Sequence, residues 1–156
     1  MKRYIVFITL SICLLTATAT TVQKYSFDHY AKMNNITRVY ISKKLFDIIG
    51  NAPLTSAGLN FSKIVHKLDG LLVLNGETYA IKEQMKKDEK KFEQSTYYDV
   101  FLRHSEKNES RVVYIHEEKK SIVEMVIFIF NEDSYSIIQV LGKLQPKDLS
   151  TIMNMQ

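Results

Sequence analysis

The ten residues Ser121–Phe130, SIVEMVIFIF, decide the fold of this 156-residue chain. Eight of them are apolar and most are β-branched or aromatic, which is typical of a buried β-strand. Alternation along the strand places two apolar sets on opposite faces, Ile122, Val126, Phe128 and Phe130 on one and Val123, Met125, Ile127 and Ile129 on the other. The run therefore predicts a central strand whose sheet is covered on at least one face, with Glu124 as its only charge.

Two further strand-like runs flank this segment, RVVYIHE at residues 111–117 and YSIIQVLGKL at residues 135–144. The connecting residues EKK (118–120) and NED (131–133) have the length of hairpin loops. The last third of the chain is therefore predicted to form a three-stranded antiparallel meander, followed by a helix that opens at Pro146.

The preceding residues mix strands and helices without a strict alternation. Strand patterns cover residues 36–42 and 71–76, and helical patterns cover residues 26–35, 43–49, 61–68, 77–94 and 95–104. This order predicts an α+β fold, a mostly antiparallel sheet of about five strands with helices packed against it.

The helical patterns also predict which side chains face the core. Leu45, Ile48 and Ile49 share one side of the first helix, and Ile81, Met85 and Phe92 form the inner stripe of the second. The charged run KKDEKK at residues 86–91 is interpreted as a solvent-exposed helix face.

The start of the chain has the layout of a secretory signal peptide: Lys2 and Arg3, then an apolar run, then small polar residues. Ala17 and Ala19 form an A-x-A pattern, which favours cleavage between Ala19 and Thr20. Residues 1–19 are therefore predicted to be a signal peptide, and residues 20–156 a single domain. The alternative is lipidation at Cys13, but the large Ile12 stands where a lipoprotein signal has a small residue.

Two residues are candidates for a ligand-binding site. Burying the carboxylate of Glu124 within an apolar strand is unfavourable without a partner, so Glu124 is expected either to pair with a lysine or with Arg111, or to face a cleft. His116 lies at the end of the preceding strand, beside Glu117 and Glu118. We recognise no catalytic motif, metal-binding spacing or cofactor-binding loop in the sequence.

Several segments together resemble one protein family: ITRVYISKKLFDII (36–49), LDGLLVL (68–74), TYYDVFL (96–102), VVYIHEEKKSIVEMVIFI (112–129) and IIQVLGKLQPKDLSTI (137–152). They resemble exported bacterial proteins that carry the domain of unknown function 4252. The resemblance implies a periplasmic, secreted or lipid-anchored location, and no catalytic residue is inherited from it.

The sequence leads to three hypotheses for the function. The first is a non-enzymatic envelope protein that binds or regulates another envelope protein, with Tyr40, Tyr114 and Tyr135 as candidate contact residues. The second is a small ligand-binding or hydrolytic protein with a cleft near Glu124 or His116. The third is a structural component of the envelope.

The formal charge and the predicted signal peptide limit the classes of partner that we expect. Lys2 and Arg3 supply half of the formal net charge of +4, so the predicted mature chain carries only +2 and no nucleic-acid partner is expected. A membrane partner is expected only if Cys13 carries a lipid. The oligomeric state is left open.

Overall fold

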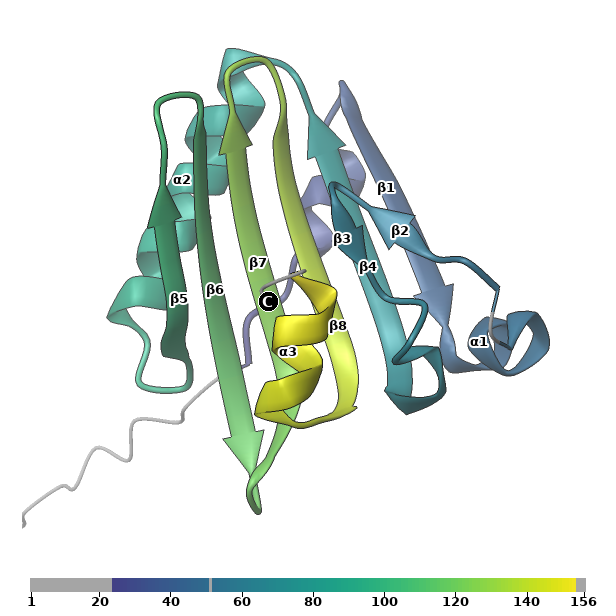
Figure 1. The fold of residues 1–156 in the computed structure, drawn as a ribbon. Helices are drawn as coiled ribbons and strands as arrows, with labels where there is room; N and C mark the ends of the chain where they lie inside the picture. Colours follow the sequence, from purple (N-terminus) through teal and green to yellow (C-terminus); the bar gives the residue numbers. More distant parts are fainter. Residues whose placement is uncertain (1–23, 51, 154–156) are drawn as a thin grey trace, which may run out of the picture.

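The computed structural model describes residues 24–50 and 52–153, which form one six-stranded antiparallel sheet with helices on both faces (Figure 1). The strand order is β1-β4-β8-β7-β6-β5, and a separate short hairpin joins β2 to β3. The strands are β1 (Ile36–Ser42), β2 (Thr55–Ser56), β3 (Leu59–Asn60), β4 (Leu68–Gly76), β5 (Asp99–Ser105), β6 (Glu109–Glu118), β7 (Ser121–Asn131) and β8 (Tyr135–Leu144). The helices are α1 (Lys43–Ile49), α2 (Tyr79–Gln94) and α3 (Pro146–Ile152), with 3₁₀ turns η1 (Asp28–Lys32) and η2 (Val65–Lys67).

The predicted α+β class and the C-terminal meander are confirmed. β6, β7 and β8 pair consecutively and antiparallel, and β7 lies at the centre of the meander. The sheet has one strand more than expected because the edge strand β5, Asp99–Ser105, replaces most of the helix predicted over residues 95–104. The β-branched and aromatic residues Val100 and Phe101 suit this strand, and β5 pairs with β6 from Asp99 to Ser105.

A bulge in β7 changes the predicted distribution of side chains between the two faces. The register of β6 with β7 shifts between His116 and Glu117, which pair with Glu124 and Ile122, so β7 has one extra residue there. Ile122 consequently joins Met125 and Ile127 on one face, whereas Val126 and Phe128 lie on the other. The prediction that Ile122 shares a face with Val126 is therefore wrong, and Glu124 lies at the point where the strand is irregular.

Each face of the sheet has its own apolar core. On the face toward the viewer in Figure 1, α3 and residues from α1 and the β2–β3 region pack on the strands. On the opposite face, α2 and the segment around η1 pack on them. The second core is rich in aromatic rings: Phe27, Tyr30, Phe92, Tyr98, Tyr114, Phe128, Phe130 and Tyr135.

Close packing explains one glycine in the sheet. A side chain at Gly142 of β8 would collide with the backbone carbonyl of Lys67, just before β4. This contact brings η2 against β8, and Lys67 then forms an ion pair with Asp148 of α3, with Nζ 2.7 Å from Oδ1. The C-terminal helix is thereby fixed over the centre of the sheet.

Candidate functional site

Glu124 is buried on the face of the sheet that carries α2, with 1% of its surface exposed. Gln139 of the neighbouring strand β8 donates a hydrogen bond from Nε2 to Glu124 Oε1, at 2.5 Å. Lys24 Nζ lies 3.5 Å from Oε2, and Oε2 itself accepts no hydrogen bond from any described residue. The expected lysine partner is present, whereas Arg111 instead pairs with Glu109, so that alternative is wrong.

The surroundings of Glu124 form a shallow, solvent-open cavity of about 370 Å³ that Lys24, Tyr97 and Lys143 help to line. Burial, followed by the negative charge of Glu124, raises the pKa values of Tyr97 and Tyr98. Both phenols therefore stay protonated at neutral pH. The arrangement fits a carboxylate held by structural contacts at the edge of the second core.

His116 lies directly across from Glu124 in the register of β6 and β7. Its ring stacks on Tyr97 with centroids 3.7 Å apart, and its Nδ1 lies 2.8 Å from the backbone carbonyl of Tyr97. Because a carbonyl only accepts hydrogen bonds, Nδ1 carries the proton there, and Nε2 points toward Glu118 at 3.6 Å. The structure thus brings the two predicted residues together as neighbours, with each engaged by other groups. Within the described residues, no group of three or more metal-binding side chains is present.

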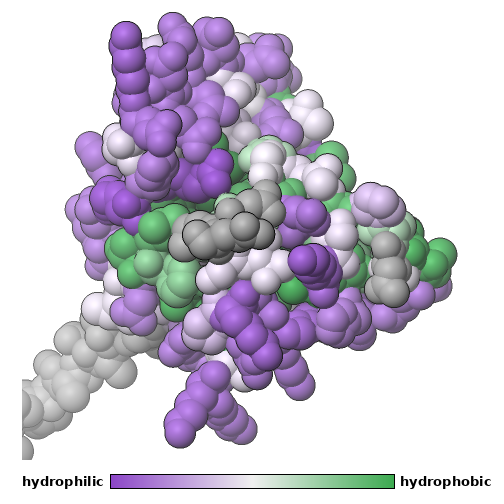
Figure 2. Space-filling model, in the orientation of Figure 1, coloured by the Kyte–Doolittle hydropathy of each residue, from purple (hydrophilic) through white to green (hydrophobic). Residues whose placement is uncertain are grey.

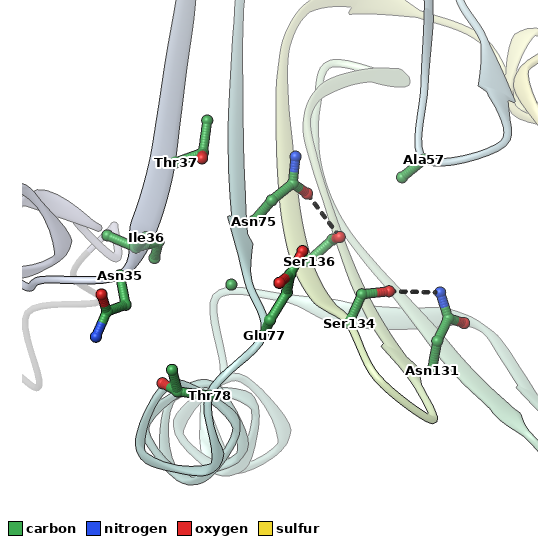
Figure 3. Close-up of a pocket in the computed structure, with 11 residues that line it drawn as sticks. Asn35, Ile36, Thr37, Ala57, Asn75, Glu77, Thr78, Asn131, Ser134 and Ser136 are labelled. Atoms are coloured by element: carbon green, nitrogen blue, oxygen red, sulfur yellow. Dashed lines mark hydrogen bonds between the residues drawn. The ribbon is translucent and has the colours of Figure 1, made fainter.

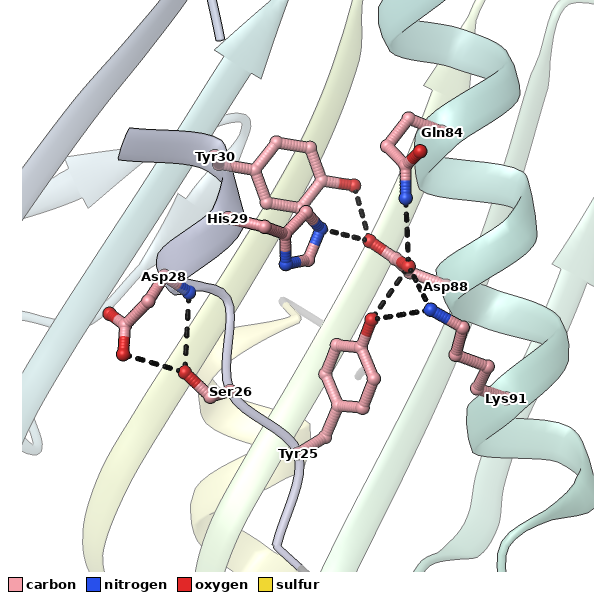
Figure 4. A network of polar contacts seen from close by, with 8 residues as sticks. All are labelled: Tyr25, Ser26, Asp28, His29, Tyr30, Gln84, Asp88 and Lys91. Carbon is pink, nitrogen blue, oxygen red and sulfur yellow. Dashed lines mark hydrogen bonds and ion pairs between the residues drawn. The ribbon is translucent and has the colours of Figure 1, made fainter. Parts of the chain in front are cut away.

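Asp88 forms a polar network that the sequence analysis missed (Figure 4). It lies inside the charged run 86–91, which was predicted to be solvent-exposed, yet its exposed fraction is 0%. The helical spacing carries a signal that was available, since Ile81, Met85, Asp88 and Phe92 follow one stripe of α2. The interpretation of the whole run as an exposed face is wrong at this one residue.

Five side chains contact the Asp88 carboxylate. Oδ2 accepts a hydrogen bond from the hydroxyl of Tyr30 at 2.7 Å and lies 2.8 Å from His29 Nε2. Oδ1 accepts from the Tyr25 hydroxyl at 2.6 Å, and from Gln84 and Lys91 at 3.1 Å each. The network attaches the segment before β1 to α2.

The charges in this network shift several pKa values. Burial by itself would raise the pKa of Asp88, but the hydrogen bonds from Tyr25, Tyr30 and Lys91 hold it below its ordinary value. Burial and the contact with Asp88 raise the pKa of Tyr25 to about 12. Asp88 is therefore ionised at neutral pH and already has a full set of donors, so its role is to hold the structure together.

Exposed apolar side chains lie on both faces of the edge strand β1, near its middle, and on α1. These side chains, which we call the β1–α1 surface, are Val39, Tyr40, Leu45 and Ile48, with exposed fractions from 42% to 73%. Figure 2 shows hydrophobic colouring at the right-hand margin, where Figure 1 places α1. The prediction that Leu45 and Ile48 face the core is wrong, because α1 docks through Phe46 and the half-buried Ile49.

The three tyrosines predicted to be contact residues differ in their exposure. Tyr40 is 60% exposed, as expected, whereas Tyr114 and Tyr135 are buried at 0% and 6%. Tyr114 packs under Phe92 of α2, with ring centroids 5.5 Å apart. Of the three, only Tyr40 is available for contact with a partner.

Comparison with known proteins identifies the family. Residues 30–152 match the family described as domain of unknown function DUF4252. The chain belongs to this family. No curated protein and no solved structure matches it significantly. The DUF4252 match spans every strand of the sheet and all three α-helices, and it begins within η1.

Among the described residues, no helix combines the length and the apolar character needed to cross a membrane. The predicted signal peptide lies outside the described residues, and so do its cleavage site at Ala17, Ala19 and Thr20 and the alternative lipidation site Cys13.

Proposed function

We propose that this DUF4252 protein is an exported, non-enzymatic binding module of the bacterial cell envelope. In this proposal its partner is another envelope protein, which docks on the β1–α1 surface. The observation that carries the proposal is the exposure of Val39, Tyr40, Leu45 and Ile48 beside a strand edge that no described strand pairs with. Exposed apolar side chains grouped in this way mark interaction surfaces.

The geometry of β1 favours a partner segment in extended conformation. An edge strand presents unpaired backbone N–H and C=O groups along its outer side. Val39 and Tyr40 point to opposite faces of the sheet, since they are consecutive residues of the strand. A strand added to this edge places apolar side chains against Val39 on one face and against Tyr40 on the other. Main-chain pairing then supplies affinity and the side chains supply specificity.

Contacts elsewhere in the chain support a non-enzymatic role. Glu124 is held by Gln139 and Lys24, and the Nδ1 of His116 is committed to a backbone carbonyl. Asp88 is saturated by five donors. A general base has to reach a proton on a substrate. Asp88 and the Nδ1 of His116 are engaged within the protein, and Glu124 Oε2, which accepts no hydrogen bond from any described residue, is buried beside Lys24 Nζ.

Site-specific photo-crosslinking in the native envelope tests the docking surface. A photoreactive residue at position 40 or 48 should give one reproducible adduct, and the same residue at Tyr79 should not. Tyr79 is a matched control because it is a tyrosine that is 73% exposed, on α2. Hydrogen exchange should then show new protection of the β1 amides in the purified complex. Adducts of equal yield at Tyr79, or unchanged exchange of β1, contradict the proposal.

Intact mass and N-terminal sequencing of the native protein test the predicted export. A start at Thr20 with no added mass supports a free exported protein. A start at Cys13 with acyl mass replaces that with a lipid-anchored envelope protein. An intact N-terminus at Met1 contradicts export.

A further inference from the structure

A polar row crosses one end of the sheet on the face that carries α3. Thr37 of β1, Asn75 of β4 and Ser136 of β8 are register partners across three adjacent strands. Ser136 is only 6% exposed, and its Oγ donates a hydrogen bond to Asn75 Oδ1 at 2.7 Å. The next row on the same face is apolar, formed by Val39, Val73 and Ile138. The core therefore ends at a strip of hydroxyl and amide groups.

This strip is the floor of a cavity with a volume of about 700 Å³ (Figure 3). The β7–β8 loop forms one wall, where Asn131 Nδ2 donates to Ser134 Oγ at 3.2 Å. Ala57, at the turn of the β2–β3 hairpin, and Glu77, just before α2, complete the rim. Volumes of this size are typical of small-molecule sites.

The chemistry of the lining selects a class of ligand. Asparagine amides and serine or threonine hydroxyls both donate and accept hydrogen bonds, as do the adjacent hydroxyl groups of a sugar. Among the residues that line the cavity, Glu77 is the only charged one, so the site repels anions. We propose that this cavity binds a small saccharide that is uncharged or positively charged, with Glu77 facing an amino group where the sugar has one.

This inference is independent of partner docking. The cavity uses Asn35 and the first two residues of β1, Ile36 and Thr37, whereas the β1–α1 surface begins at Val39, further along that strand. Tyr40, Leu45 and Ile48 do not line the cavity, so substitutions at these residues test docking without altering the cavity lining.

Three sugars that share a pyranose ring test the proposal. Titrations followed by two-dimensional NMR use glucosamine as the cation, N-acetylglucosamine as the neutral sugar and glucuronate as the anion. Saturable shifts at the side-chain amides of Asn75 and Asn131 are expected with the first two sugars and not with glucuronate. The absence of saturable shifts with glucosamine and N-acetylglucosamine overturns the proposal, and so does equal binding of glucuronate.

Variants separate the cavity from non-specific binding. Asn75→Ala should weaken binding of both sugars about tenfold, whereas Asn108→Ala, in the exposed β5–β6 turn, should leave it unchanged. Thr37→Val removes an exposed hydroxyl with little change in shape and should also weaken binding, which covers the case that Asn75→Ala unfolds.

Glu77→Gln tests the role of the charge. It should weaken the binding of glucosamine about threefold and leave the binding of N-acetylglucosamine unchanged. Unchanged affinities in Asn75→Ala and Thr37→Val overturn the site, and an unchanged glucosamine affinity in Glu77→Gln overturns the role of its charge.

Discussion

Asp88 attaches the segment before β1 to α2, and its charge makes that attachment depend on pH. Asp88→Asn should reduce the free energy of unfolding by about 2–3 kcal/mol at pH 7, because buried donors lose an ionised acceptor. The pKa of Asp88 is depressed in the folded state, so its contribution is present at neutral pH. It declines as the pH falls below about 4, the ordinary pKa of an aspartate.

Urea unfolding at pH 7 and pH 3 measures this prediction. The difference between wild type and Asp88→Asn should narrow at the lower pH. Asp28→Asn is the matched control, because Asp28 lies nearby but its side chain is 84% exposed, and it should unfold close to wild type. An equal difference between wild type and Asp88→Asn at both pH values contradicts the proposed role of the charge.

Substitutions at Glu124 and at Gln139 should change the free energy of unfolding by different amounts, because only the loss of Gln139 leaves a buried charge without its hydrogen-bond donor. Gln139→Leu leaves the carboxylate without its hydrogen bond and should lower the free energy of unfolding by about 2–3 kcal/mol. Glu124→Gln keeps an acceptor for Gln139 and should change stability by less than about 1 kcal/mol. The double variant Glu124→Leu/Gln139→Leu should recover most of the loss in Gln139→Leu. If the double variant is less stable than Gln139→Leu, the buried contact is not the source of the loss.

Among the secondary-structure elements, the β6–β7 hairpin has a turn whose backbone and sequence disagree. Lys119 and Lys120 both have positive φ, at 49° and 66°, a conformation that Asn-Gly adopts more readily than two lysines. Lys119→Asn/Lys120→Gly should therefore stabilise the protein by about 1 kcal/mol, measured by thermal unfolding. In the β5–β6 turn, Lys107 and Asn108 do not have positive φ, so Lys107→Asn/Asn108→Gly should give no gain. If the double substitutions in both turns stabilise the protein, the positive φ angles of Lys119 and Lys120 are not the cause of the gain.

Long elements could be predicted from the sequence, because many residues contribute to their patterns. β7 and α2 are examples, with 11 and 16 residues. The short elements β1 and α1 could also be located, but the inward face of α1 and the strand conformation of β5 could not be predicted. In the seven-residue α1, Phe46 and Ile49 compete with Leu45 and Ile48 for the core, and docking against the sheet decides between them. In β5, apolar spacing fits both a helix and a strand, and pairing with β6 decides.

The candidate site could be predicted only as single residues. Glu124 was identified because a charge interrupts an apolar strand, and its position opposite His116 depends on a register that sequence does not provide. Gln139 reaches Glu124 because β8 pairs with β7, whereas Lys24 lies before the first strand, and its contact with Glu124 depends on how the N-terminal segment packs. Asp88 was hidden because its neighbours are charged as well, although the helical stripe places it inward.

At the scale of the whole molecule, the fold extends beyond the family match on the N-terminal side. The match begins at residue 30, yet Phe27 is 2% exposed in the second core and Tyr25 binds Asp88. A chain that starts at Tyr30 should therefore be less stable than one that starts at Thr20 by roughly 5 kcal/mol, from the loss of Phe27 and of two groups bound to Asp88. The midpoint of thermal unfolding should fall by about 10–20 °C.

A double-mutant cycle connects this loss to the attachment of the N-terminal segment to α2. In the chain that starts at Tyr30, Asp88 no longer has Tyr25 and His29 as partners, so Asp88→Asn should be less destabilising there than in the longer chain. Phe27→Ala in the longer chain is the control, since it removes core packing without removing either partner of Asp88, and it should leave the effect of Asp88→Asn nearly unchanged. Equal effects of Asp88→Asn in the long and the short chain would show that the segment is held by Phe27 and the aromatic core alone. A smaller effect in the short chain assigns part of the stability of the whole fold to the residues that precede the family match.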